Sequence, residues 1–155
     1  MKELYEYRAK LLIRLDETTG KFCAACKAFT DPFAPVKDGW TAHQIAFHVR
    51  DVNREVYDMR IRRTLNEDNP LFKNFDPDVW MTEKYDRDEP LEKILSEFTA
   101  EMNELLGTLK HVPVEAWSRS SSHEALGPDL SLQLWVERSL GHVEEHLAAL
   151  EIRQK

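Results

Sequence analysis

The segment LQLWVERSLGHVEEHLAAL, residues 132–150, places the strongest single constraint on the fold. Its apolar residues recur at the spacing of one face of an α-helix: Leu132, Trp135, Val136, Leu140, Val143, Leu147 and Leu150. His142 and His146 lie beside this face, one helical turn apart. Two imidazoles so placed can share one metal ion, as in the H-E-x-x-H motif. The pair alone also fits two unrelated surface histidines, so a metal site requires further ligands from another segment.

Length, composition and charge limit the class of protein. The chain has 155 residues, of which 42% are hydrophobic and 32% charged, and its net charge is −7. We therefore expect one domain, residues 1–155, with a proper hydrophobic core. The negative charge argues against nucleic acid and against an anionic membrane surface as partners. No apolar run is long enough for a membrane span, and the start lacks a signal peptide's apolar core, so we expect a cytoplasmic protein.

Three further amphipathic segments precede the histidine-bearing one. They cover about Lys2–Phe29, Thr41–Asn66 and Pro90–His111. Thr41 followed by Gln44 is a capping box, which predicts that the second helix begins there. With Ser131 as the expected cap of the last helix and no credible strand alternation, the sequence predicts an all-α fold, a four-helix bundle. Residues 68–88 predict a long connection between helices two and three, with a short helix near 77–82.

The second helix supplies the candidate third ligand. His48 falls within its apolar stripe, whereas His43 lies about 140° around the helix and should point elsewhere. Glu55, seven residues after His48, should lie almost directly below it on the same face. A single histidine on an apolar face is more often a core residue than a metal ligand. His48 gains weight only because facing helices of a bundle can bring it to His142 and His146.

Cys23 and Cys26 form a C-x-x-C pattern with two possible interpretations. A redox C-x-x-C usually begins a helix after a strand, where the helix dipole lowers the thiol pKa. This pattern lies deep inside a predicted helix, and no second C-x-x-C completes a zinc site. We therefore expect two buried, reduced structural cysteines.

Three imidazoles with a free position for an exogenous ligand are typical of a catalytic rather than a structural metal site. Unpaired histidines would be costly on or beside apolar stripes, which favours a shared ion. The alternative is three core histidines that hydrogen-bond to neighbours. The residue types do not choose between nickel, zinc, manganese and iron.

The chain resembles the DinB-like (damage-inducible B) family of metal-binding four-helix bundles. The resemblance rests on an ordered set of segments: residues 40–51 (WTAHQIAFHVRD), residues 60–63 (RIRR), the Trp117…Arg119…His123…Gly127 loop, and residues 142–147 (HVEEHL). It implies an up-down-down-up bundle, frequently a homodimer. It also implies His48, His142 and His146 as ligands of one divalent ion, often nickel or zinc. One position departs from the family, which often has an acidic residue where this chain has Asn53.

The resemblance implies a metal-dependent enzyme with a small-molecule substrate. Family members include transferases that use a low-molecular-weight thiol, isomerases and presumed hydrolases. Glu55 or His123 would then serve as general base or substrate anchor. The alternative is a non-catalytic, metal-binding stress or regulatory bundle that acts through a dimer surface. No residue beside the ligands is an unambiguous proton-transfer group, which keeps this alternative open.

Overall fold

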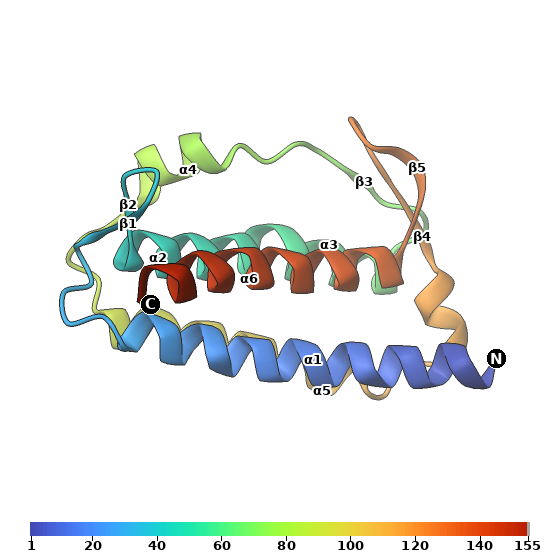
Figure 1. Cartoon of the computed structure of the whole chain (residues 1–155). Coiled ribbons are helices and arrows are strands. Elements are labelled where there is room, and N and C mark those ends of the chain that lie inside the picture. The colour runs from blue at the N-terminus through green and yellow to red at the C-terminus, as the bar shows by residue number, and fades with distance from the viewer. Residues whose placement is uncertain (155) are drawn as a thin grey trace.

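Four long helical segments run side by side and form the body of the molecule (Figure 1). The computed structural model describes residues 1–154. The segments are α1 (Lys2–Lys27), a composite second segment over Ala42–Asn66, α5 (Leu91–Leu109) and α6 (Leu132–Gln154). The second segment and α5 run opposite to α1, and α6 returns parallel to it (Figure 1). The predicted four-helix bundle with up-down-down-up order is therefore confirmed.

The hydrophobic core lies between the four segments. Its largest fully buried side chains come from every one of them: Leu15 and Phe22 of α1, Ile61 of the second segment, Phe98 and Met102 of α5, and Trp135 of α6. Burial of such side chains is worth about 1.5–3 kcal/mol each. Within residues 1–154, no helix has the length and apolar content that a bilayer crossing demands.

The second segment is not one regular helix. It consists of α2 (Ala42–Val52), a π-helix η1 (Asn53–Asp58) and α3 (Met59–Asn66). Its start is as predicted, because the Thr41 hydroxyl accepts the Gln44 N–H while the Gln44 side chain accepts the Thr41 N–H. The prediction of an uninterrupted α-helix was wrong at η1. The wider π turn changes which side chains face the core after Val52.

Short strands occupy regions that the sequence predicted to be irregular. A hairpin of β1 (Pro35–Lys37) and β2 (Trp40–Thr41) precedes α2, and β3 (Leu71–Phe72) pairs in parallel with β4 (Ser120–His123). β5 (Gly127–Ser131) completes that sheet, antiparallel to β4. The expectation of no strands was wrong, because strands of two to five residues are too short to show alternation.

Two short helices complete the connections. α4 (Pro77–Lys84) confirms the short helix predicted in the long connection, and Asp76 caps it by accepting two backbone N–H groups. η2 (Val114–Ser118) is a 3₁₀ helix before β4. The Ser131 hydroxyl accepts the Leu134 N–H, as expected of a cap for α6.

The two cysteines are buried and free, which confirms their predicted structural character. Burial raises the pKa of both thiols, and the Cys23 sulfur contacts the Thr99 hydroxyl at 3.4 Å. Protonated, buried thiols are poor nucleophiles. The cysteines therefore belong to the α1–α5 packing.

A buried arginine joins α2 to the start of α5. The Arg50 guanidinium, only 4% exposed, binds both Glu89 oxygens at 2.6 and 2.8 Å and Asp51 at 2.8 Å. These bonds lower the pKa of Glu89 to about 2. Asp51 also accepts the Trp80 indole N–H at 2.8 Å, which attaches α4 to the same cluster.

We expect Arg50→Met to lower the free energy of unfolding by about 3 kcal/mol, because it removes the cation that pairs with buried Asp51 and half-buried Glu89. Urea denaturation measures this loss. Arg54→Met is the matched control: Arg54 is 40% exposed and pairs with Glu101, so its loss should cost less than about 1 kcal/mol. Equal losses for the two variants would contradict a special role for Arg50.

Candidate metal centre

Three histidines from two antiparallel helices meet at one place in the bundle. His48 comes from the middle of α2, and His142 and His146 come from successive turns of α6. Their candidate ligand nitrogens all lie within 4.8 Å of one another. The Nε2 atoms of His48 and His142 are 3.0 Å apart. The structure thus brings together the three residues that the sequence singled out as ligands.

The surroundings of the three rings keep them neutral. His48 is 7% exposed, and its ring stands edge-on to Trp40 with centroids 5.1 Å apart. Burial, reinforced by neighbouring imidazoles, lowers the pKa of His48 to about 4 and that of His142 to about 2. Burial also lowers the pKa of His146. Neutral imidazole is the form that binds metal ions.

The donor set fits a divalent transition metal. Imidazole nitrogens suit zinc, nickel, copper and iron, whereas magnesium and calcium prefer oxygen ligands. Three protein ligands leave coordination positions for exogenous groups, the arrangement of catalytic sites.

The three histidines line an open cavity of about 440 Å³. This volume lies in the range of small-molecule sites. Tyr57 and Arg60 from the second segment and His123 from β4 also line it. Of the two predicted catalytic residues, His123 lines the same cavity as the three histidines. Glu55 is half-buried on η1 and does not line this cavity.

The π-helix explains the position of Glu55. In a regular α-helix Glu55 would lie below His48, and Tyr57, nine residues on, would face the opposite side at 100° per residue. The wider turn of η1 delays this rotation. Tyr57 consequently lines the cavity, with its ring centroid 5.6 Å from that of His142. The role of Glu55 as a base stays a prediction.

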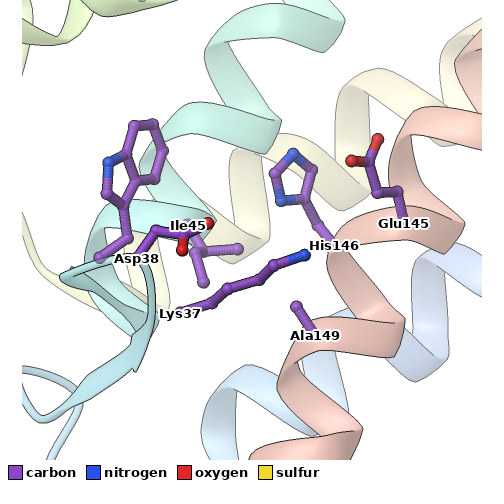
Figure 2. A pocket seen from close by; sticks show the side chains of 7 residues that line it. Lys37, Asp38, Ile45, Glu145, His146 and Ala149 are labelled. Carbon is purple, nitrogen blue, oxygen red and sulfur yellow. The ribbon is translucent and has the colours of Figure 1, made fainter.

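His146 also lines a smaller cavity of about 180 Å³ (Figure 2). Lys37 extends from the β1–β2 hairpin towards His146, and Glu145 projects from the neighbouring position of α6 (Figure 2). The Lys37 charge contributes to lowering the pKa of His146, while Glu145 opposes it. Glu145 lines both cavities, so it is a charged group available to either.

Sequence analysis missed four residues of this site. Lys37 lies on a hairpin that gave no pattern, and Tyr57 and Arg60 face the cavity only through the π-helix. Glu145 could have been found, because it lies three residues after His142 and next to His146 on the helix that the motif defines.

His123 is held in a defined orientation. Its Nδ1 accepts the backbone N–H groups of Ala125 and Leu126 at 3.0 and 3.2 Å. The neutral ring therefore has its proton on Nε2. Burial, followed by the nearby Arg60 charge, lowers the pKa of His123. These bonds favour His123 as a hydrogen-bond donor or substrate anchor over a general base.

Two other positions from the sequence have clear locations. His43, predicted to point away from the site, is buried and binds the Tyr85 hydroxyl and the Glu89 carbonyl, both at 2.7 Å. Asn53 is the first residue of η1 and is 2% exposed. Among residues 1–154, its side-chain amide has no hydrogen-bond partner.

The fold and the three clustered histidines define a class: a four-helix bundle with a candidate metal centre between its helices. The sequence profile of the DinB superfamily matches residues 7–150, most of the chain. The protein belongs to the DinB superfamily. A search of curated proteins gave no match.

A solved structure supports the same fold. YfiT from Bacillus subtilis, described as a probable metal-dependent hydrolase with an unusual four-helix bundle topology, superimposes with a TM-score of 0.86. The match covers 96% of this chain and 86% of YfiT, at 21% sequence identity. Identity this low establishes the shared fold alone.

The lowered pKa values predict how the metal-free protein responds to acid. The unfolded chain binds protons at these histidines below about pH 6.5, whereas folded His48 resists protonation until about pH 4. Folding stability must therefore fall as the pH decreases through this window. Between pH 7 and pH 5, the wild type should lose about 2 kcal/mol more unfolding free energy than His48→Gln.

Urea denaturation in the presence of a chelator measures this difference. His111→Gln, which removes an exposed histidine outside the site, controls for the loss of a histidine. Identical pH dependence for wild type and His48→Gln would show that His48 is not kept neutral by the fold.

Proposed function

We propose that the protein is a divalent-metal-dependent enzyme that hydrolyses a small molecule. The convergence of His48, His142 and His146 on one wall of an open cavity carries this proposal. The description of YfiT as a probable metal-dependent hydrolase supports the same reaction class. Nickel and zinc are the ions that we propose first, with manganese and iron as alternatives.

The three histidines would hold the ion, and the cavity would hold the substrate beside it. A divalent ion in such a site supplies Lewis acidity and lowers the pKa of an adjacent water or thiol group. The protein's own residues then have three tasks. They orient the substrate, accept a proton and limit access of bulk water.

Glu145 is our candidate for the proton acceptor. Its carboxylate lines the histidine cavity and lies next to His146 in the sequence, whereas Glu55 does not reach the wall. Tyr57 and His123 line the same cavity, and their O–H and Nε2–H groups would be donors to a developing negative charge. Lys37 adds positive charge near His146 from the smaller cavity.

Thiol transfer is the alternative reaction at the same centre. The protein's own thiols, Cys23 and Cys26, are buried in α1 and are not part of the cavity wall. A thiol reaction would therefore require a low-molecular-weight thiol as cosubstrate. The homodimer implied by the family resemblance remains a proposal and is not needed to complete the three-histidine group.

Metal analysis of His48→Ala and His142→Ala tests the ligands. Each variant should lose metal affinity by more than about 100-fold, because even the loss of a residue that only hydrogen-bonds to a ligand costs about 10–100-fold. His111→Ala, an exposed histidine outside the site, should keep the wild-type metal content. If both site variants retained one equivalent of metal, the ligand assignment would be wrong.

Turnover assays then separate the reactions. Protein loaded with zinc, nickel, manganese or iron is tested against esters and amides, and against electrophiles with and without an added thiol. We expect hydrolysis that a chelator abolishes and that Glu145→Gln slows at least tenfold. Turnover that requires the thiol would indicate the transferase. Bound metal without any turnover would favour the non-catalytic, regulatory bundle.

A further inference from the structure

Arg60 of α3 is a buried cation without an anionic partner. It is 7% exposed, and no carboxylate of residues 1–154 lies within ion-pair distance of it. Its guanidinium lies against apolar rings instead, 4.8 Å from Trp135 and 5.8 Å from Phe72. Arg62 and Arg63 on the same helix pair with Asp58 and Glu67. A buried charge is costly unless it is paired, so the lone state of Arg60 requires an explanation.

Hydrogen-bond donors outnumber acceptors around this guanidinium. Nη2 donates to the Lys73 carbonyl at 3.2 Å, and Nε has no partner among residues 1–154. Nη2 also lies 3.4 Å from Nε2 of His123. Because His123 Nδ1 accepts two backbone N–H groups, Nε2 has the proton. This N–H and Arg60 Nη2 therefore face each other as two donors, and the Lys73 carbonyl is the acceptor for both.

Both donors line the cavity that contains the three histidines. Tyr57 lines it too, with its ring beside that of His142. Arg138, exposed nearby on α6, adds a second positive charge that acts on both Arg60 and His123. The only carboxylate on the cavity wall within the described chain is Glu145, which lies between His142 and His146 on α6.

We propose that this cavity takes a small organic anion, with a carboxylate or phosphate group on Arg60, His123 and Tyr57. The rest of the molecule extends towards the three histidines. The planar guanidinium matches both anions, and the His123 Nε2–H supplies a further donor. Glu145, which lies on α6 between His142 and His146, would repel the anionic group and so favours its placement on Arg60. That this anion is the substrate of an enzyme rests on the proposed function. That the cavity binds an anion does not depend on it.

Titration of full-length protein with benzoate, inorganic phosphate and neutral benzamide tests the anion site. The protein is freed of metal by a chelator, so that the probes cannot bind an ion. The arginine Nε–H signal of Arg60 in a ¹H–¹⁵N NMR spectrum reports on the guanidinium directly. We expect benzoate or phosphate to shift this signal and benzamide to leave it unchanged. The anion that binds with the higher affinity shows whether the site prefers a carboxylate or a phosphate group.

Arg60→Met should weaken anion binding at least tenfold, the effect of losing a charged hydrogen-bond partner. Arg62→Met is the matched control, because it removes the same charge from the same helix away from the cavity; its affinity should stay within twofold. Arg60→Lys keeps the positive charge but loses the two parallel N–H donors of the guanidinium, so it should bind the anion more weakly than wild type. This variant replaces Arg60→Met in the test if Arg60→Met does not fold. Unchanged affinity in the Arg60 variants, an unshifted Arg60 signal, or equal binding of benzamide would overturn the proposal.

These titrations need neither metal nor turnover. Absence of catalysis would therefore refute the proposed enzyme while leaving the anion site standing. Conversely, metal-dependent turnover by a protein that does not bind either anion would refute the anion site alone.

Discussion

The 3.0 Å contact between the Nε2 atoms of His48 and His142 is the constraint on which the site depends. The two residues are separated by 94 positions in the chain, so only the packing of α2 against α6 can bring them together. Packing in the core fixes this distance, and burial then keeps the imidazoles neutral at physiological pH. The bundle thus sets both the position and the protonation state of the histidines before any ion arrives.

The π-helix η1 determines what surrounds that contact. The six residues of η1 lie between α2, which holds His48, and α3, and their wider turn rotates the second segment out of the regular α-helical phase. Tyr57 and Arg60 reach the cavity as a result, and Glu55 does not line it. π-helical turns are often found at functional sites, and here the irregularity changes which polar groups share a wall with the histidines.

The sequence predicted the features that depend on regular periodicity. The four amphipathic segments and the inward position of His48 follow from 3.6 residues per turn, and the Thr41 capping box follows from the residue types at the helix start. It did not predict Tyr57 and Arg60, because no residue pattern marked the π-helix. It also missed the strand that holds His123, since β4 is short and pairs with β3 and β5 from distant or unpatterned segments. Long-range pairing of this kind leaves no local signal.

The two buried arginines of the second segment illustrate how the same side chain can serve fold or site. Arg50 has two close carboxylate partners, Asp51 and Glu89, and its bonds to them connect α2 to the start of α5. Arg60 is almost as buried but has only apolar rings, one carbonyl and a facing donor around it. A protein that needed Arg60 only for packing would gain by replacing it with an apolar residue. The position of this unpaired charge on the wall of the histidine cavity is therefore best explained by an anionic ligand that forms an ion pair with Arg60.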